Sequence, residues 1–379
     1  MFPRSFRPRR SLSLLACVAL AVGLVAPASA ASAPQAGPVG FRGPADRAAA
    51  AAHWQGGELN RHGVIINSGF QDWGLTIDTI FALAADGRHP VLLHRASKAI
   101  RTNYYTHYTR FQGTISANAM AKTLVVAKVI RANAHTFGGH DVRRLVLDRV
   151  AGPAAGLEQG RLRDKTTQTY PTDFSSTFGQ ALGVIGLARS GGVPDDVVSY
   201  LLRQRCSDGF FRLQEVPEQT CDEGNASQSA PDVDATALAI EALVSARDHG
   251  ATLPAGVVAG SVKWLISMQK ANGSFGGGVA TPGSNTNSTG LAAQALAATG
   301  RTKAARAAGV FVRSMQITRA AAGNGPATKD LGAIALNRQT LNQAIRHGIT
   351  STTRGLFLRS TPQAYFALRR VPLGELTAP

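Results

Sequence analysis

A pair of helical segments that recurs along the chain is the feature that most constrains its fold. Residues 231 to 278 read as two amphipathic helices followed by a polar, glycine-rich turn. Apolar or small side chains recur along one face of the first helix at i, i+3, i+4 and i+7: Thr236, Ala239, Ile240 and Leu243. Neither helix could bury its apolar face alone, so copies of the unit are expected elsewhere in the chain.

Degenerate copies of this unit are present. Segment 286–296 overlays segment 233–243 without a gap, so that Asn287 aligns with Asp234 and Thr289 with Thr236. Segments 74–84 and 178–188 follow the same register more loosely. A Gln, then a Gly, then an aromatic residue two positions after that Gly closes several of the second helices, for example in residues 204–211 and 269–275.

Helix pairs with this turn, each followed by a helix of the Asp/Asn-x-Thr…Ala-Leu type, resemble the repeats of the terpenoid cyclase and protein prenyltransferase superfamily, which includes the squalene cyclases. The resemblance covers roughly residues 48 to 368. It implies an all-α fold, an α/α toroid (barrel) of about six helix pairs around a central cavity. Because the Gln/Gly/aromatic turn is a structural device, the resemblance says more about fold than about activity.

The periodicity predicts alternating outer and inner helices. We place outer helices at 48–59, 90–100, 141–150, 194–205, 254–269 and 303–316, and inner helices at 74–85, 116–132, 176–190, 233–249 and 286–298. Beyond residue 318, segments 337–347 and 361–370 are helical and 328–336 is a turn or a helix. Six pairs are expected, with room for a partial seventh.

The first thirty residues have the features of a signal peptide. Four arginines precede an apolar run at 12–27, and Ala28, Ser29 and Ala30 offer small residues for cleavage. We therefore expect residues 1–30 to be removed, 31–45 to be a spacer, 46–375 to form the toroid domain, and the protein to be secreted or extracytoplasmic. The adjacent Arg9 and Arg10 leave the export route, Sec or twin-arginine, open. No later stretch reaches the ~18 apolar residues of a membrane span.

The two cysteines beyond the leader, Cys206 and Cys221, flank a loop. A disulfide there would close a loop of about 15 residues. The loss of chain entropy in the unfolded state would then stabilise the fold by roughly 3 kcal/mol. The alternative, a pair of thiols that bind metal, lacks a third ligand at a recognisable spacing. Prenyltransferases hold zinc with Asp, Cys and His, but the spacing of His135 and His140 is not diagnostic of zinc. No metal site and no cofactor are expected.

The formal net charge of +17 favours anionic partners such as cell-envelope polymers or lipid headgroups. A nucleic-acid partner is not expected, because the basic residues are dispersed and no binding motif or stacking aromatics accompany them. The alternative is a solvated helical surface that is basic without a partner. We expect a monomer.

In a closed ring the N-termini of the inner helices gather on one rim, where their dipoles favour an anionic or polar group. This rim is where a ligand is expected. Asp78 and Lys122 each interrupt an apolar segment, so they either face solvent or point into the cavity opposite each other. The rim candidates for ligand binding are Asp78, Lys122, Gln180, Asn287 and Gln363, together with Asp232 and Asp234.

Asp234 is the sharpest catalytic candidate. Squalene cyclases use an Asp-x-Asp-Asp-Thr element whose middle acid protonates the substrate, and residues 232–236 (DVDAT) resemble it with Ala235 in the third acidic place. The resemblance implies that Asp234 is a general acid, with Asp232 as the like-charged neighbour that helps to keep it protonated. The alternative is that Asp234 caps its helix, since Asn287, an equally good cap, fills the same place one repeat later.

Two classes of function follow. The first is a secreted toroid that binds or processes a lipid-like or polar ligand in its cavity, by general-acid chemistry if Asp234 acts. The second is a non-catalytic carrier or an envelope-binding protein. A carrier is considered because a single secreted toroid with a disulfide is also similar to the cobalamin-carrier helical domain. Aromatic residues make up only 6% of the chain, and its length suits one barrel, which both argue against a carbocation-steering triterpene cyclase.

Overall fold

A computed structural model describes residues 44–379. The predicted signal peptide at 1–30 lies outside the described residues, as does the predicted spacer up to residue 43. Within residues 44–379, no helix combines the length and the apolar character that crossing a membrane requires.

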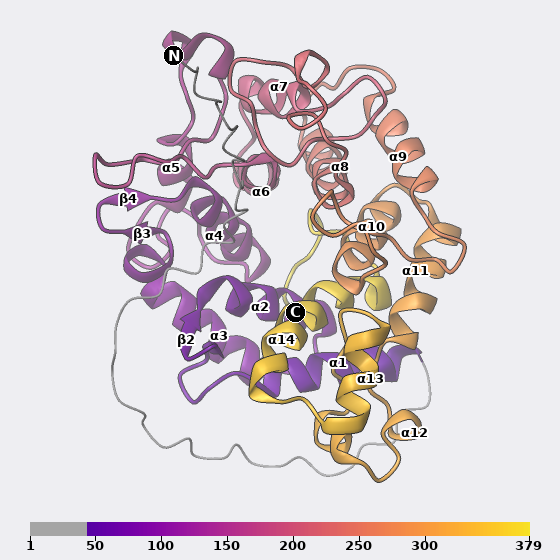
Figure 1. Ribbon diagram of the computed structural model, residues 1–379. Coiled ribbons are helices and arrows are strands. Elements are labelled where there is room, and N and C mark those ends of the chain that lie inside the picture. The colour runs from indigo at the N-terminus through magenta and orange to yellow at the C-terminus, as the bar shows by residue number, and fades with distance from the viewer. Residues whose placement is uncertain (1–43) are drawn as a thin grey trace, which may run out of the picture. The chain divides into compact units, whose positions relative to one another are not determined.

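Six inner helices form a closed ring in which each contacts the next and the last contacts the first (Figure 1). They are α2 (Trp73–Asp86), α4 (Ala117–Val129), α6 (Thr177–Ala188), α8 (Val233–Asp248), α10 (Thr286–Ala298) and α14 (Ser351–Arg369). Contacts between α14 and α2 close the ring. The inner helices are more buried than the outer ones. In α8, every residue from Val233 to Ala246 except Asp234 is buried, thirteen residues in all.

Six outer helices surround this ring, and each packs against at least one inner helix. They are α1 (Pro44–Gly57), α3 (Pro90–Asn103), α5 (Val142–Leu147), α7 (Asp195–Arg203), α9 (Val257–Ser267) and α11 (Thr302–Ser314). The outer helices α7 and α11 have one apolar and one polar face, as helices between core and solvent do. The predicted all-α toroid of six pairs is therefore confirmed.

Short elements fill the connections. Two antiparallel hairpins precede α2 and α4, formed by β1 (Ile65–Asn67) with β2 (Phe70–Asp72) and by β3 (Arg110–Phe111) with β4 (Thr114–Ile115). Helices α12 (Arg319–Ala322) and α13 (Arg338–His347) lie between α11 and α14. Shorter helical turns occupy Tyr104–Tyr108, Pro153–Glu158, Cys221–Glu223 and Pro326–Asp330.

The predicted helix boundaries hold to within a few residues, with one clear exception. The last inner helix was predicted at 361–370 but begins at Ser351. Its first turns are rich in Ser, Thr and Gly, and Pro362 lies in its interior, so its sequence resembles a turn followed by a helix start. Packing against α1, α2 and α10 stabilises it in spite of these residues.

One hydrogen bond recurs where a turn meets the next inner helix, and we call it the turn joint. In it, the backbone N–H two residues after a glycine donates to a side-chain oxygen of that helix, which lies near the helix start except in α14. Phe211 donates to Thr236 Oγ1 at 2.8 Å, and Phe275 donates to Thr289 Oγ1 at 3.0 Å. The other turn joints pair Ile65 with Thr76, Leu162 with Gln180 Oε1, and Ile334 with Thr361. The Gln/Gly/aromatic pattern is thus one version of a joint that also accepts Ile or Leu.

The glycine of each turn joint lies against the backbone of the next outer helix. A Cβ atom added at Gly332 (φ 101°) would lie 2.2 Å from the carbonyl oxygen of Ala50 in α1. Gln316 binds the same seam, because its amide donates to Gly332 O at 3.0 Å and to Arg47 O at 2.8 Å. This contact joins the last helix pair to the first and so closes the outer wall.

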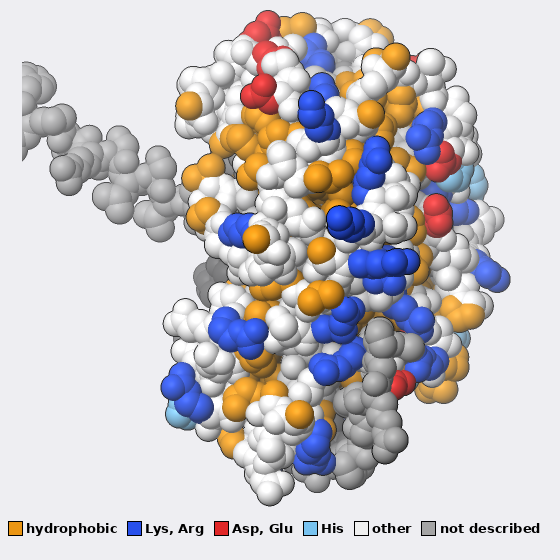
Figure 2. Space-filling model, turned by 90° about the vertical axis from the view of Figure 1, so that its right-hand side faces the viewer, with side chains coloured by type: hydrophobic (Ala, Val, Ile, Leu, Met, Phe, Trp, Pro, Cys, Tyr) orange, Lys and Arg blue, Asp and Glu red, His pale blue; other side chains and the backbone are white. Residues whose placement is uncertain are grey.

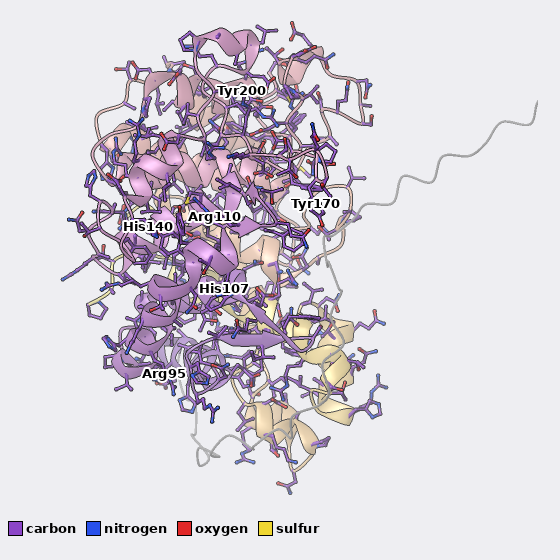
Figure 3. The ribbon with its side chains drawn as sticks, turned by 90° about the vertical axis from the view of Figure 1, so that its left-hand side faces the viewer. Arg95, His107, Arg110, His140, Tyr170 and Tyr200 are labelled. Atoms are coloured by element: carbon purple, nitrogen blue, oxygen red, sulfur yellow. A yellow bond between two sulfur atoms is a disulfide. The ribbon has the colours of Figure 1, made fainter. Side chains whose placement is uncertain are left out.

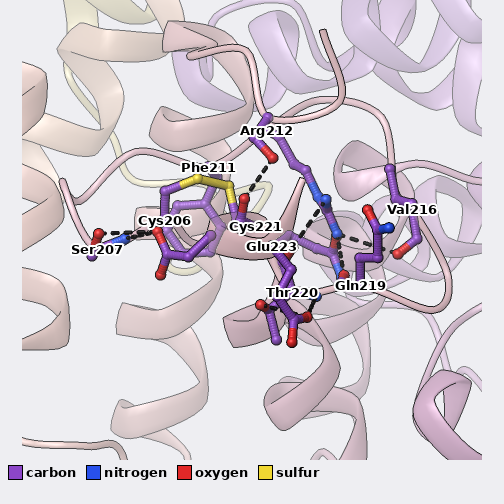
Figure 4. The surroundings of a disulfide bond; sticks show 12 residues. Cys206, Ser207, Phe211, Arg212, Val216, Gln219, Thr220, Cys221 and Glu223 are labelled. Atoms are coloured by element: carbon purple, nitrogen blue, oxygen red, sulfur yellow. Dashed lines mark hydrogen bonds between the residues drawn. A yellow bond between two sulfur atoms is a disulfide. The ribbon is translucent and has the colours of Figure 1, made fainter. Parts of the chain in front are cut away.

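The predicted disulfide between Cys206 and Cys221 is present, with Cα atoms 4.8 Å apart (Figure 4). It closes the loop that connects α7 to α8. Inside this loop the buried Arg212 guanidinium donates to Gln204 Oε1 at 2.9 Å and to the carbonyl oxygen of Val216 at 3.3 Å. The loop is therefore held by a covalent bond and packed around one buried arginine.

Replacement of Gly332 by alanine should weaken the contact that joins the last helix pair to the first. The matched control is Gly300→Ala, because Gly300 also has a positive φ (70°) but has no atom within 4 Å of an added Cβ. Both variants carry backbone strain, and only Gly332→Ala adds a collision with α1. We expect Gly332→Ala to lose at least about 2 kcal/mol more than Gly300→Ala in urea unfolding. Equal losses would show that the seam does not control stability.

Candidate functional site

The hub of the ring encloses a cavity of about 480 Å³. Most of its wall is apolar, and the larger apolar side chains that line it are Phe81, Phe178, Leu182, Leu238, Leu291, Phe366 and Leu373. The cavity is therefore a place where an apolar ligand could leave water.

Helical register explains which side chains reach this cavity. In five of the six inner helices, α14 excepted, the residue six positions after the N-cap residue lines the wall, as Asp78 does after Asp72 and Lys122 after Ser116. The same offset from Ser176, Asp232 and Asn285 gives Leu182, Leu238 and Leu291. One face of each inner helix thus points at the hub, as the repeat predicts.

Asp78 and Lys122 form an ion pair on the cavity wall. Lys122 Nζ lies 2.6 Å from Asp78 Oδ1 and donates to the carbonyl oxygen of Gly74 at 3.1 Å. Their side chains are 14% and 18% exposed. Burial alone would lower the pKa of Lys122, but the Asp78 carboxylate and Tyr108 raise it above the ordinary lysine value. The structure therefore brings together two residues predicted to face each other across the cavity, and Lys122 stays charged.

Tyr108 also lines the cavity and was not predicted as a site residue. It ends the π-helical turn Tyr104–Tyr108. Burial raises the pKa of Tyr108 to about 12, so its phenol keeps its proton at neutral pH. Nothing in the local sequence distinguishes Tyr108 from Tyr105, because a π-turn depends on packing rather than on a motif.

Three amide side chains complete the polar part of the wall. Gln363 was predicted, whereas Asn118 and Gln294 were missed. Asn118 donates to the carbonyl oxygen of Phe174 at 3.0 Å, and its own Oδ1 is buried without a partner. It lies four residues before Lys122, so the helical spacing that identified Lys122 could have found it.

The cap assignment at α8 needs correction. Asp232, not Asp234, is the N-cap residue, since its Oδ1 accepts from the backbone N–H of Ala235 at 2.7 Å. In α10 the cap is Asn285 and not Asn287. Asp and Asn are good caps in either place, so sequence alone could not fix the register. Asp234 and Asn287 instead occupy the second helical position, and each has a buried Oδ1 without a partner.

Asp234 lies one helical turn before Leu238 but is not among the residues that line the cavity. Its side chain lies against the backbone of Gly277, where an added Cβ atom would be 3.0 Å from Asp234 Oδ2. Burial raises the pKa of Asp234 to about 7; a hydrogen bond from Ser288 opposes the shift and the Asp232 charge adds to it. Burial also raises the pKa of Asp232.

Gln180 lies away from the cavity wall. Its Oε1 accepts from the backbone N–H of Leu162 at 2.8 Å, and its amide donates to the carbonyl oxygens of Gly160 and Val197 at 2.9 Å. In this turn joint Gln180 is therefore the acceptor, whereas the acceptor in the other turn joints is a threonine. Its hydrogen bond to Val197 also connects α6 with α7. This arrangement leaves its side chain no free polar atom for a ligand.

The last residues of the chain form the floor of the cavity. Leu373 lines it, and its backbone N–H donates to the Glu241 carboxylate at 2.8 Å. Arg189 donates to the carbonyl oxygens of Leu373 and Leu376 at 2.9 and 2.7 Å, and Ala378 N–H donates to Val129 O at 2.7 Å. The segment thus crosses the C-terminal ends of α8, α6 and α4, and Figure 1 shows it inside the ring.

Exposed phenylalanines lie on the loops at the opposite end of the hub, where the inner helices begin. Phe70, Phe111 and Phe174 are 56%, 45% and 58% exposed and precede α2, α4 and α6. Phe111 meets Tyr170 edge to face with ring centroids 5.4 Å apart, and Figure 3 shows Tyr170 and Arg110 on this side of the molecule. The entrance side is therefore partly apolar.

The described residues contain no group of three or more His, Cys, Asp or Glu side chains placed to hold a metal ion.

No protein-family model and no curated protein sequence matches the chain. Solved structures do match its fold. A protein from Actinoplanes aligns with a TM-score of 0.56 and 15% identity over 86% of this chain and 99% of its own. Unsaturated glucuronyl hydrolase from Bacillus sp. GL1 aligns with a TM-score of 0.54 and 11% identity over 88% of this chain and 98% of its own.

The type II terpene cyclase MstE from Scytonema, solved with geranylgeranyl dihydroxybenzoate, aligns with a TM-score of 0.51 and 15% identity over 86% of this chain and 98% of its own. Identities this low establish fold and not activity. The chain therefore has the α/α-toroid fold that a hydrolase and a terpene cyclase also adopt.

Replacement of Glu241 by glutamine should change the pH dependence of stability. Burial raises the pKa of Glu241 to about 8 from an ordinary value of 4.5, so the folded protein keeps a proton that the unfolded chain releases. Folding stability is then lost as pH rises between those two values. We expect Glu241→Gln to gain stability relative to wild type from about pH 5 to about pH 8, by on the order of a few kcal/mol.

The control for this comparison is Glu218→Gln, which removes an exposed carboxylate from the loop after α7. Urea unfolding at each pH measures both differences. A difference between wild type and Glu241→Gln that does not change with pH would contradict a buried, protonated Glu241.

Proposed function

We propose that this protein binds an amphipathic small molecule, with an apolar body and an acceptor or anionic group, in the hub cavity. The observation that carries the proposal is an apolar cavity of about 480 Å³ with the Asp78–Lys122 ion pair on its wall. Burial of apolar ligand surface supplies affinity at about 25 cal/mol per Å². The ion pair supplies orientation.

Lys122 is suited to receive the polar group of such a ligand. An ammonium group has three N–H donors, and in Lys122 two of them are directed to Asp78 and to Gly74 O. The third remains for a carboxylate, phosphate or hydroxyl oxygen. Tyr108, protonated at neutral pH, offers a second donor on the same wall. The exposed Phe70, Phe111 and Phe174 at the entrance side favour the approach of an apolar molecule.

Filling the cavity should abolish this binding. Anilinonaphthalene sulfonate is a suitable probe, because it joins an apolar ring system to an anionic group and fluoresces when it leaves water. We expect Leu182→Trp and Leu238→Trp to weaken probe binding at least about tenfold, since each indole would occupy space in the hub.

The control for the filling variants is Ile266→Trp, which adds the same ring to an exposed position (39%) on α9. Thermal unfolding confirms that each variant folds. Probe binding that is unchanged in both filling variants would place the ligand outside the hub.

Acid chemistry by Asp234 is the second candidate function, and one observation favours it. Asp234 combines a buried, unpartnered Oδ1 with a pKa raised by burial to about 7, so a large fraction of it carries a proton at neutral pH. It lies one turn from the cavity wall, at the end where the inner helices begin. A carboxylic acid of this kind can protonate a bound ligand.

Carbon-13 NMR of the aspartate carboxyl groups tests this candidate without a known substrate. We expect Asp234 to titrate near pH 7. We also expect Asp232→Asn to lower its pKa, because asparagine keeps the cap and removes the like charge. The Asp234→Asn variant, which removes one titrating signal, assigns the resonance. A titration of Asp234 near the ordinary value of 3.8 would eliminate it as the acid.

A further inference from the structure

The outer wall from α9 to α12 carries many cations and no acidic residue. Residues 249 to 329 contain eight Lys and Arg and no Asp or Glu. Seven of these cations are exposed. Lys270 donates to the carbonyl oxygen of Pro282 and to Ser284 Oγ, and we call the other six the basic wall: Lys263, Arg301, Lys303, Arg306, Arg319 and Lys329. Figure 2 views the molecule from the side of α9 and α11 and shows Lys and Arg down the middle of this face, with Asp and Glu at its margins.

The basic wall is a surface of like charges without counter-ions in the described part of the chain. None of its six side chains forms a salt bridge with a residue in the range 44–379. Elsewhere Arg144 pairs with Asp148 at 2.9 Å, and Arg354 pairs with Glu58 at 2.6 Å. An uncompensated positive surface repels itself and attracts anions from solution. A partner that supplies several negative charges would relieve this repulsion.

Position on the helices makes the basic wall suitable for an extended partner. Lys303 and Arg306 are three residues apart and therefore share one face of α11. Lys263 lies on α9, and Arg319 lies on α12. The charges are thus spread across neighbouring helices rather than gathered in one pocket, so several of them can be engaged only by a partner with many charges.

We infer that the basic wall binds a linear polyanion, a polymer with phosphate or carboxylate groups along its length, independently of the hub cavity. Guanidinium and ammonium groups both bind such oxygens, and the Arg side chains can do so bidentately. Each contact would release counter-ions from the polymer, so binding should weaken as salt increases.

A bilayer or a nucleic acid fits this wall less well. Four exposed large apolar side chains lie in the region of the basic wall, but none of them is a Trp or Tyr of the kind that membrane interfaces favour: Ile266, Met268, Val279 and Val310. The exposed aromatic side chains among the large hydrophobics of the described residues lie away from this wall, on the hairpins before α2 and α4 and on the connection before α6: Phe70, Phe111 and Phe174. Bases would therefore find no ring to stack on along the basic wall.

The test measures binding of fluorescently labelled inorganic polyphosphate and of alginate, a carboxylate polymer, between about 50 and 200 mM salt. The variant Lys303→Glu/Arg306→Glu removes two adjacent wall cations. We expect it to weaken binding to at least one polymer about tenfold or more and to make the slope of log affinity against log salt shallower by about 1.5. The more tightly bound polymer identifies phosphate or carboxylate as the preferred group.

The matched control is Lys98→Glu/Lys165→Glu, which changes the net charge equally at exposed sites on α3 and on the connection between α5 and α6. We expect less than a twofold effect on affinity. A second wall variant, Lys303→Ala/Arg306→Ala, keeps good helix formers in α11 and should weaken binding in the same direction. A native near-UV circular dichroism spectrum and a cooperative thermal unfolding transition show that each variant is folded.

Three outcomes would overturn the inference. Equal losses in the wall and control variants would show that only net charge matters. Binding to phosphatidylglycerol vesicles without binding to either polymer would identify a lipid surface as the partner. Tighter binding to duplex DNA than to polyphosphate would identify a nucleic acid.

Discussion

The turn joint is the interaction on which the rest of the structure depends. The backbone N–H of a turn residue donates to a hydroxyl or amide oxygen of an inner helix, as Phe275 does to Thr289. The nearby glycine lets that turn lie against the next outer helix. Repetition of this joint fixes the angle between successive pairs, and Gln316 and Gly332 join the last pair to the first. Closure then forces one face of every inner helix to surround a shared hub.

Periodicity predicted this architecture because helix pairs that cannot bury an apolar face alone must stack. It could not predict details set by contacts distant in sequence. Gln180 was expected at the ligand site, but it takes the place of a threonine in a turn joint with Leu162. The cap at α8 was placed two residues late, because Asp232 and Asp234 have equal local propensity. Glu241 was missed because its partner, Leu373, lies more than one hundred residues further along the chain.

The hub joins two physical environments that explain the proposed binding. Its wall is apolar, and its charged groups, Asp78 and Lys122, neutralise each other. This pair could be predicted because a charge within an apolar helical stripe must either face solvent or find a partner. The floor could not, since the terminal segment has no helical pattern and is held by Arg189 and Glu241. The terminal segment therefore covers one end of the cavity, and we propose that a ligand enters at the other end, where the inner helices begin.

Methyl NMR of the leucines is the most direct test of the claim that the hub is the binding site. The protein would be titrated with dodecanoate, which has an apolar chain and one carboxylate. The account predicts that the methyl signals of Leu182, Leu238 and Leu291 shift together and saturate, while those of Leu157 and Leu356, which are exposed, do not move. Shifts confined to the exposed leucines, with the three hub leucines unchanged, would contradict it.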